Sequence, residues 1–437
     1  MGKAQQIANW GMYPQVQAKV AELGYTDELQ TFVKTEEELL ARGNGRCYGD
    51  AALSTTIFST LKLNKILSFD PTSGVMACQA GVLLSSILEV VVPKGFFLPV
   101  TPGTKFITIG GAIAADVHGK NHHSEGCFSD HVLSFDLMLS DGQIITCARN
   151  ENPDWFWATV GGMGLTGIIV QATFQLKPIE TAYIRMESIK AQNLAEIMSL
   201  FEASEDWTYT VSWIDCLQKG KHIGRSIMMR GEHATIDELP PKFSGAPLSL
   251  KPKMNLNVPF QFPSFALNTL SVKAFNFLYY HKQRQKQLNI ISDYDTFFYP
   301  LDAIHNWNRI YGKKGFTQYQ FVIPKEVSRE GLEEILRTIA ASGQGSFLAV
   351  LKLFGKNNPE AYNSFPFEGY TLALDFKINR SLPKLIAQLD ELVQKYQGRI
   401  YLAKDAFSVK HSDLIIPNLP ENRKFTSLQQ TRLATQA

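Results

Sequence analysis

The sequence predicts an α+β protein of two domains, one of them interrupted by the other. The chain has 437 residues, which is more than one hydrophobic core normally serves. Its N-terminal part reads mainly as strand hairpins. Its C-terminal part follows the order β-α-β-β-α-β, typical of a ferredoxin-like antiparallel sheet. A hydrophobic content of 45% with 19% charged residues fits an ordinary globular protein with deep cores.

The first elements are a short helix and a hairpin. The helix is predicted over residues 35–40, and the glycine-rich stretch 43–49 ends it. Residues 61–69 and 75–79 form a hairpin, because Asp70-Pro-Thr-Ser-Gly74 between them is a strong turn signal.

A second hairpin joins residues 132–139 to 143–147, since Asp141-Gly142 readily supplies the positive φ of a tight turn. A helix is predicted over 153–157, with the preceding asparagine as its cap and Pro153 at its first position. Residues 168–176 are rich in β-branched side chains and are predicted to form a strand.

The C-terminal part alternates strands with two helices whose apolar residues recur at helical spacing. The predicted order is strand 318–323, helix 329–341, strands 346–354 and 370–378, helix 382–396 and strand 399–403. Gly398 is a natural C-cap for the second helix.

A ferredoxin-like sheet carries its helices on one face, so period-2 alternation separates two sets of side chains. The set predicted to pack under the helices is Tyr319, Phe321, Leu372, Leu374 and Phe376. The set predicted on the open face, where its polar members could hold a sugar ring, is Gln318, Gln320, Thr371, Ala373 and Asp375.

Residues 251–281 are rich in Pro, Phe, Leu and Asn without a clean period. Structureless segments of this length are uncommon unless they have a function. The segment is predicted either to cover a core irregularly or to be a mobile lid. A lid with aromatic and aliphatic side chains would suit a lipid-tailed substrate at a membrane surface.

Composition narrows the class of partner. A net charge of +2 without a concentrated basic stripe gives no reason to expect nucleic acid. The five cysteines contain no C-x-x-C pair, which favours reduced thiols in the cytoplasm. No signal core and no apolar run near the roughly 20 residues of a membrane span is present. We therefore expect a soluble protein, at most peripheral at the inner face of the plasma membrane.

Gly162-Met-Gly-Leu-Thr-Gly167 matches the G-x-G-x-x-G fingerprint of Rossmann folds. Those glycines follow a strand and open a helix, whose N-terminus faces the pyrophosphate. Here a predicted helix precedes the motif and a strand follows it. The motif is therefore predicted to be a tight turn that could still approach a cofactor closely.

Two other glycine-rich stretches, 41–50 and 108–111, are predicted to bind a large phosphate-bearing ligand. Backbone amides without obstructing side chains can form an anion-binding nest, and Arg42 and Arg46 could offset phosphate charge. A tightly packed turn is the alternative for either stretch alone. Their combination favours the ligand.

Four histidines raise a zinc hydrolase as an alternative. They are His118, His122, His123 and His131. A helix is doubtful at the glycine and asparagine between them, and no H-E-x-x-H arrangement is present. The sequence therefore favours a site without metal.

Several long motifs carry a family resemblance. They cover residues 42–50, 110–123, 156–169, 307–312, 318–321, 351–355 and 401–405, and Gly110-Gly-Ala-Ile-Ala-Ala-Asp-Val-His-Gly-Lys-Asn-His-His123 is the most specific. The chain resembles the vanillyl-alcohol-oxidase (PCMH) type of flavoprotein. Within that type it is similar to the decaprenylphosphoryl-β-D-ribose 2'-oxidase family, flavin subunits of a ribose-to-arabinose epimerase of cell-wall biosynthesis.

This resemblance implies an FAD-binding domain of residues 1–182 and 399–437, with the substrate domain 183–398 inserted. It assigns to FAD the residues Ala41, Arg42, Gly43, Asn44, Gly45, Arg46, Cys47, Tyr48, Gly49, Asp50, Gly103, Thr108, Ile109, Gly110, Gly111, Ala115, Asp116, Val117, His118, Ile168 and Tyr401. It assigns to the substrate Lys120, Gln318, Gln320, Lys352, Thr371, Ala373 and Phe298. The implied catalytic residues are Lys404, His118 and Lys120.

The chain departs from the family pattern at a few positions. Cys47 replaces a serine beside the pyrophosphate, Thr371 and Ala373 replace Asn and Cys, and Phe298 stands where a tyrosine is usual. These changes leave the sugar open, and Ala373 predicts insensitivity to inhibitors that attach to that cysteine. Aldonolactone or alditol oxidases carry His-Trp-Gly-Lys where this chain has Tyr401-Leu-Ala-Lys404, which favours the sugar-phospholipid branch.

By this resemblance, the protein would oxidise the C2' hydroxyl of a polyprenyl-phosphoryl ribose to a ketone, using dissociable FAD. Lys404 would either deprotonate the hydroxyl or only neutralise charge. A quinone or oxygen would accept the electrons, and a short-chain reductase would complete the epimerisation. An inactive flavin-binding scaffold that serves a partner is a further alternative.

Overall fold

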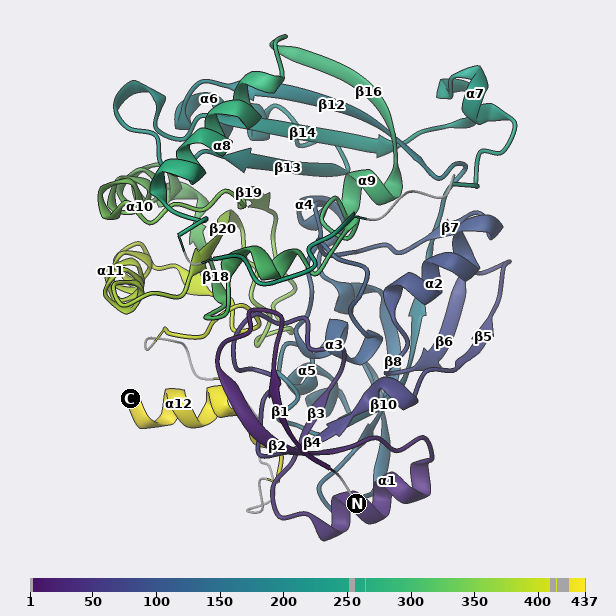
Figure 1. The fold of residues 1–437 in the computed structure, drawn as a ribbon. Helices are drawn as coiled ribbons and strands as arrows, with labels where there is room; N and C mark the ends of the chain where they lie inside the picture. Colours follow the sequence, from purple (N-terminus) through teal and green to yellow (C-terminus); the bar gives the residue numbers. More distant parts are fainter. Residues whose placement is uncertain (1–2, 251–255, 264, 409–413, 415–423, 437) are drawn as a thin grey trace.

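A computed structural model describes residues 3–250, 256–263, 265–408, 414 and 424–436 (Figure 1). No helix within these ranges is long and apolar enough to cross a membrane. Residues 251–255 and 264 of the segment 251–281 singled out in the sequence lie outside the described residues.

The N-terminal strands form a four-stranded sheet. Its order is β1 (Lys3–Ala8), β2 (Gln15–Ala21), β4 (Thr56–Ser59) and β3 (Leu40–Arg42). The helix predicted over 35–40 is wrong, because helix α1 (Thr26–Thr35) ends where it was expected to begin. Leu39 and Leu40 are fully buried, and Leu40 pairs in parallel with Ile57. Burial in a sheet has overridden the local helix propensity.

A five-stranded sheet follows, and it confirms both predicted hairpins. Its order is β5 (Ile66–Phe69), β6 (Val75–Gln79), β10 (Ile168–Gln175), β8 (Val132–Met138) and β9 (Ile144–Ala148). The helices beside it are α2 (Leu84–Val91), α3 (Ile109–Ala114), α4 (His122–Glu125) and α5 (Pro153–Thr159). The short strands β7 (Phe96–Phe97) and β11 (Lys177–Pro178) pair with each other.

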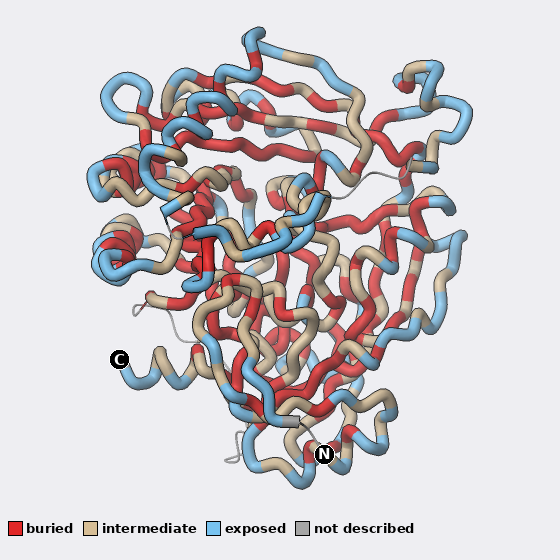
Figure 2. The backbone as a smooth tube through the Cα atoms, in the orientation of Figure 1, coloured by how far each residue is buried: buried red, intermediate tan, exposed pale blue. Residues whose placement is uncertain are grey.

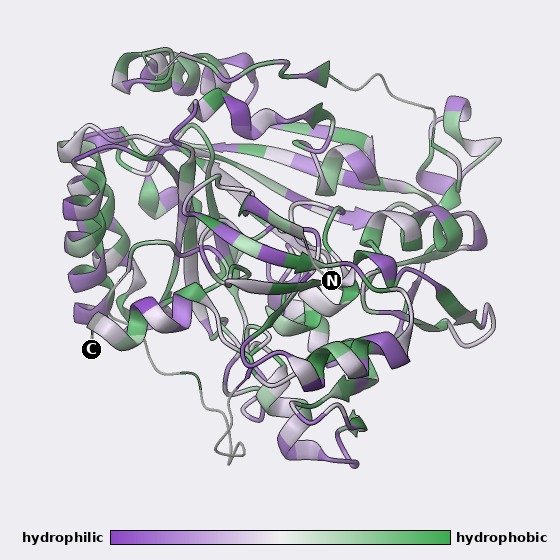
Figure 3. Ribbon diagram, turned by 60° about the horizontal axis from the view of Figure 1, so that its bottom comes forward, coloured by the Kyte–Doolittle hydropathy of each residue, from purple (hydrophilic) through white to green (hydrophobic). Residues whose placement is uncertain are grey.

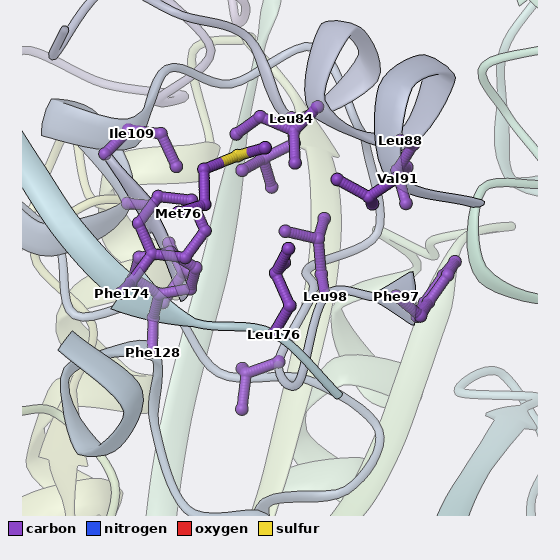
Figure 4. Close-up of a cluster of buried hydrophobic side chains, with 14 of the residues drawn as sticks. Met76, Leu84, Leu88, Val91, Phe97, Leu98, Ile109, Phe128, Phe174 and Leu176 are labelled. Carbon is purple, nitrogen blue, oxygen red and sulfur yellow. The ribbon is translucent and has the colours of Figure 1, made fainter. Parts of the chain in front are cut away.

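Apolar side chains of this sheet and its helices converge in one core. Met76 of β6 and Phe174 of β10 lie beside Leu84 of α2 and Ile109 of α3, and all four are fully buried (Figure 4). The core thus holds the helix α3 against the sheet. The helix α5 starts at Pro153 with Asn152 at the N-cap position, as predicted, but the Asn152 side chain forms no capping hydrogen bond and donates to the carbonyl of Thr146.

The C-terminal part confirms the ferredoxin-like order. The elements are β18 (Phe316–Pro324), α10 (Ser328–Ser342), β19 (Ala349–Phe354), β20 (Gly369–Lys377), α11 (Leu382–Lys395) and β21 (Arg399–Ile400). They pair in the order β19-β20-β18-β21. Gly398 lies two residues beyond the observed C-cap, Tyr396, and a Cβ at Gly398 would press against the carbonyl of Val322.

The preceding segment repeats this strand order, a repeat that the sequence did not reveal. Its elements are β12 (Tyr183–Ala191), α6 (Leu194–Glu202), β13 (Tyr209–Ile214), β14 (Ser226–His233), α8 (Thr269–Lys282) and β16 (Gln287–Asp293). They pair as β16-β12-β14-β13, and β13 joins β19 through Ser212 and Leu351. One eight-stranded sheet results. The helix α8 also corrects the prediction that 251–281 is irregular.

The two faces of the eight-stranded sheet differ as predicted. Tyr319, Phe321, Leu372, Leu374 and Phe376 are buried in one core with residues of α6, α10 and α11. Polar and apolar residues are mixed around these covering helices (Figure 3), as expected of elements with one buried face. The helix α8 contributes to both faces: Val272 joins this core, whereas Tyr280 packs onto Trp213 and Ile227. These two residues alternate with the core-facing Ile214 and Met228, so the Tyr280 end of α8 covers the other face.

Short elements and the C-terminal segment complete the fold. They are α7 (Pro241–Ser244), α9 (Tyr294–Phe298), α12 (Leu428–Gln436) and the parallel pair β15 (Leu256–Asn257) and β17 (Ile304–His305). The last segment returns to the N-terminal sheets, because Phe425 bridges Leu39 and the N–H of Tyr48 donates to the carbonyl of Ala403.

Candidate functional site

A cavity of about 830 Å³ lies between the N-terminal sheets and the open face of the eight-stranded sheet. Its size falls in the upper part of the roughly 300–1,000 Å³ range of ligand pockets. It brings together predicted site residues that are far apart in the chain. They are Ala41, Gly43, Asn44, Gly45, Arg46, Cys47, Tyr48, Gly103, Thr108, Gly110, Gly111, Ala115, Val117, His118, Lys120, Phe298, Gln318, Gln320, Lys352, Ala373, Tyr401 and Lys404.

The two glycine-rich stretches touch each other at one end of the cavity. A Cβ on Gly43 would overlap Thr108 Oγ1, so only glycine permits this approach. The side chain of Asn44 reinforces the contact by donating to the carbonyl of Phe106 at 2.7 Å. The prediction that these stretches serve one site is therefore consistent with their positions.

Among the described residues, the first stretch offers a continuous run of free amides. Among the described residues, the backbone N–H groups of 43–47 have no hydrogen-bond acceptor. The N–H groups of Ile109 and Gly110 instead donate to the carbonyls of Val82 and Ala80, and Gly111 N–H donates to Thr108 Oγ1. Three of the four amides of 108–111 are thus already used within the protein, and the longer run of unpaired donors among the described residues belongs to 43–47.

The two predicted arginines also differ. Arg42 donates to the carbonyl of Ala8 at 2.9 Å and to Asn9 Oδ1 at 3.3 Å, which turns it away from the cavity. The guanidinium of Arg46 lines the cavity and lies 4.0 Å from the ring centre of Trp10. Its buried Nε has no partner among the described residues, and burial lowers its pKa. An unpaired cation in this position is suited to an anionic ligand.

Seven predicted site residues do not line the cavity. They are Arg42, Gly49, Asp50, Ile109, Asp116, Ile168 and Thr371. Ile109 and Ile168 belong to hydrophobic cores, although Gly110, Gly167 and Ile169 beside them reach the cavity.

The polar members of this group have protein partners. Asp50 is bonded to Arg432, and Asp116 accepts from the N–H of Ser129 and the hydroxyl of Ser364. Gly49 packs against the carbonyl of Asp405. Thr371 Oγ1 accepts from the side chain of Gln320 at 3.2 Å. These residues therefore contact other parts of the protein and not the cavity.

Three lysines and two glutamines, Lys120, Lys352, Lys404, Gln318 and Gln320, supply further polar groups to the cavity wall. Lys120 Nζ donates to the carbonyl of Phe298 at 3.1 Å, and Lys352 Nζ donates to the carbonyl of Gly119 at 3.2 Å. Within the described part of the chain, neither ammonium group forms an ion pair, nor does that of Lys404. Burial lowers the pKa of Lys120 and of Lys352 to about 7. These half-buried lysines face the cavity, and an anion bound there would offset the cost of their partial desolvation.

Lys404 lies next to a buried acid. Its ammonium group is 4.1 Å from the ring centre of Tyr48. Burial lowers the pKa of Lys404 to about 8, while the charge of Asp375 acts to raise it. Asp375 accepts from Gln318 at 2.6 Å and from the hydroxyl of Tyr311 at 3.1 Å, and burial raises its pKa to about 7.

His118 is enclosed by aromatic rings rather than by acids. Its ring centre lies 4.9 Å from that of Phe354 and 5.1 Å from that of Tyr401. Its Nε2 is 3.0 Å from Nε2 of Gln320, while its buried Nδ1 has no partner among the described residues. Burial holds the pKa of His118 well below its usual value, so the imidazole is neutral.

The histidine cluster does not form a metal site. His123 Nε2 is bonded to the carbonyl of Trp207, and His131 Nε2 to the carbonyl of Glu125. Across residues 3–250, 256–263, 265–408, 414 and 424–436, no three His, Cys, Asp or Glu side chains are placed to hold a metal ion. The zinc-hydrolase alternative therefore has no ligand set in the described residues.

Sequence reasoning missed two parts of the cavity wall. Trp10 and Phe106 flank Arg46. An apolar arm formed by Met186, Val211, Trp213, Met229 and Tyr279 extends the cavity along the first half of the large sheet. The alternation within β13 could have pointed to Val211 and Trp213, but the repeat that positions them was not visible.

The chain is similar in sequence to several known proteins. The family model described as FAD binding domain matches residues 18–148. The chain is 39% identical over 374 residues to decaprenylphosphoryl-beta-D-ribose oxidase of Mycolicibacterium smegmatis, covering 84% of this chain and 80% of that protein. It is 30% identical over 334 residues to an uncharacterized protein of Streptomyces coelicolor, covering 74% and 89%. It is 29% identical over 189 residues to D-arabinono-1,4-lactone oxidase of Yarrowia lipolytica, covering 41% and 36%.

Proposed function

Because the chain belongs to the decaprenylphosphoryl-beta-D-ribose oxidase family of FAD-dependent oxidoreductases, we propose that it oxidises the C2' hydroxyl of a polyprenyl-phosphoryl ribose to a ketone. The observation that carries this proposal is the cluster of three half-buried ammonium groups, those of Lys120, Lys352 and Lys404, which form no ion pair among the described residues and share one cavity with the free amides of 43–47. This arrangement offers one anion site for a cofactor and a second for a charged sugar.

The residues at the first end fit FAD. The N–H groups of 43–47 and the guanidinium of Arg46 would hold the pyrophosphate, and Gly43 lets this loop approach Thr108 closely. Bound FAD supplies the acceptor for a hydride from the sugar carbon. The proposed FAD domain comprises 1–182 and 399–437, and the proposed substrate domain comprises 183–398.

The second end would bind the substrate. Lys120 and Lys352 would hold the phosphodiester, since each keeps N–H donors beyond the single carbonyl it contacts. Gln318 and Gln320 are positioned by Asp375 and Thr371 and would bond to sugar hydroxyls. Phe298 and Ala373 line the same region, so they would contact the ring.

Lys404 would accept the proton of the reacting hydroxyl at Nζ. Its lowered pKa of about 8 leaves a useful fraction of neutral amine near neutral pH. The negative charge of the buried Asp375 stabilises the protonated form of Lys404 after the proton transfer. His118, neutral and ringed by aromatic side chains, would position Gln320 rather than exchange protons.

The remaining partners follow from the reaction class. A quinone or oxygen would reoxidise the reduced enzyme, and a short-chain reductase would reduce the ketone to complete an epimerisation. A polyprenyl tail would place the enzyme at the cytoplasmic face of the membrane as a peripheral protein.

Anaerobic mixing with a short-chain polyprenyl-phosphoryl ribose tests the proposal. We expect the visible flavin absorption to bleach, because the sugar delivers hydride in the absence of an acceptor. Polyprenyl phosphate without sugar is the control and should leave the spectrum unchanged. Bleaching by an aldonolactone but not by the ribose lipid would contradict the proposal and favour the lactone-oxidase branch.

A further inference from the structure

Exposed apolar side chains are concentrated in one segment. Fifteen large apolar residues are exposed among the described residues, and ten of them lie between Leu256 and Ile290. These ten are Leu256, Phe260, Phe262, Phe265, Leu270, Phe275, Phe277, Leu278, Tyr279 and Ile290. Exposed apolar patches of this kind mark interaction surfaces.

The helix α8 turns an apolar face outward. Its inner face is held by Asn276, whose side chain donates to Asp215, and by Tyr280, whose hydroxyl donates to the carbonyl of Ala191. Leu270 is 77% exposed and Leu278 67%. Figure 2 shows the helix as a largely exposed element on the outside of the molecule.

The strip 256–262 is held in place beside it. Its strand β15 pairs with β17, and Arg309 donates to the carbonyls of Val258 and Pro259 at 3.1 and 3.0 Å. Phe260 nevertheless points outward and is 62% exposed. These exposed rings therefore belong to an anchored strip.

The same part of the chain is strongly basic. No Asp or Glu occurs from residue 239 to residue 292, although the whole chain contains 41 acidic residues. Seven basic residues occur there: Lys242, Lys251, Lys253, Lys273, Lys282, Arg284 and Lys286. Lys273 and Lys282 lie on α8, whereas Lys286 pairs with Glu196. Apolar side chains combined with Lys and Arg, without acids, complement an anionic lipid surface.

This surface continues into the cavity. Tyr279 and Lys282 of α8 line the cavity as well as the outer surface. Ile304 and His305 of β17, the strand that pairs with β15, line it too. The apolar strip and α8 thus border the cavity where its apolar arm lies.

We propose that the surface formed by residues 256–262 and α8, the docking surface, seats on an anionic lipid bilayer. A lipid-linked substrate then reaches the cavity beside α8 while its tail remains in apolar surroundings. This inference rests on the proposed function for the identity of that substrate, but the bilayer contact itself does not require substrate.

Sedimentation of the FAD-loaded protein with vesicles tests the docking surface. We expect it to sediment with vesicles of equal parts phosphatidylglycerol and phosphatidylcholine, and much less with phosphatidylcholine alone. The double variant Leu270→Glu/Leu278→Glu should bind the anionic vesicles about 10- to 100-fold more weakly, since two apolar anchors are replaced by acids. Neither residue lines the cavity.

Matched variants separate this effect from damage to the fold. Leu133→Glu/Ile236→Glu changes two residues that are 42% and 47% exposed outside the docking surface, and should bind vesicles like the wild type. Lys273→Gln removes one exposed charge and should weaken binding about fivefold. It provides a second measurement should the double variant fail to fold.

The outcomes distinguish the docking surface from the proposed function. No sedimentation of the wild type with lipid alone would overturn the docking surface and favour a protein partner on this face. Equal binding of the wild type and the Leu270→Glu/Leu278→Glu variant would overturn it as well. Normal vesicle binding without bleaching by the ribose lipid would instead reject the proposed substrate and leave the docking surface standing.

Discussion

The guanidinium of Arg432, in the C-terminal helix α12, forms two hydrogen bonds with the carboxylate of Asp50, which ends the first glycine-rich stretch. Nε lies 2.8 Å from Oδ2, and Nη2 lies 3.0 Å from Oδ1. The same guanidinium is 2.7 Å from Asp405, which directly follows Lys404. One half-buried arginine therefore ties the amide-rich loop to the segment that carries the proposed base.

Replacement of Arg432 by Gln should destabilise the protein by about 3 kcal/mol, because two buried carboxylates lose their counter-charge. FAD affinity should fall as well, since the loop 43–47 loses an anchor. Thermal unfolding with and without added FAD measures both effects. The control is Arg337→Gln, whose ion pair with Glu333 lies on the surface, where about 0.5 kcal/mol is expected. Equal effects of the two substitutions would contradict the prediction.

Gly43→Ala should abolish FAD binding with little effect elsewhere. Its Cβ would overlap Thr108 Oγ1, so the two glycine-rich stretches would have to separate. The ratio of flavin to protein absorbance in the purified variant measures the loss. Gly245→Ala is the control, since a Cβ there meets nothing within 4 Å. Full flavin occupancy in Gly43→Ala would show that the stretches need not touch.

FAD is predicted to be bound without a covalent link, because neither Cys47 nor His118 matches a trusted linkage site. Acid precipitation should therefore leave the yellow colour in the supernatant. A coloured pellet that resists washing in denaturant would reject this prediction.

Lys404→Arg should retain charge but lose at least about 100-fold in the rate of flavin reduction, because a guanidinium cannot accept the proton. In the wild type, the rate should rise with pH and level off above about 8, where the amine of Lys404 is neutral. Stopped-flow reduction at several pH values measures both. A normal rate in Lys404→Arg would assign Lys404 to charge neutralisation instead.

Lys352→Met should stabilise the protein while it weakens substrate binding. The unfolded chain keeps the Lys352 proton up to its ordinary pKa of 10.5, whereas the folded protein loses it near pH 7. Between these values the unfolded state binds more protons, so stability should rise with pH. The melting temperature of the variant should be about 2 °C or more above that of the wild type at pH 7. Between pH 7 and pH 9 its melting temperature should rise less than that of the wild type.

The exposed Lys356 provides the matched control for this prediction. Lys356→Met removes a lysine that already meets solvent, so its melting curve should follow that of the wild type at each pH. A wild-type melting temperature that falls from pH 7 to pH 9 would contradict the assigned direction of the pKa shift.

Local patterns predicted the elements that depend on local chemistry. The turn residues of Asp70–Gly74 and Asp141-Gly142 located both hairpins, and period-2 alternation in β18 and β20 separated Tyr319 and Phe321 from Gln318 and Gln320. The helix expected over 35–40 failed because burial of Leu40 against Ile57 depends on a strand that arrives later in the chain. The repeat over β12 to β16 has no counterpart in a local pattern.

The sequence by itself determined the chemical inventory: two glycine-rich stretches, three lysines, a sheet with one polar face, and motifs shared with a flavoprotein family. Only the tertiary structure decided which of these amides and charged side chains are free to bind a ligand. The amides of 109–111 are used by Val82, Ala80 and Thr108, whereas those of 43–47 remain free. Arg42 donates to the carbonyl of Ala8 and the side chain of Asn9, whereas Arg46 faces the cavity. Hydrogen-bond partners and burial depend on what the rest of the chain brings to each group, and no spacing of residues along the sequence records that.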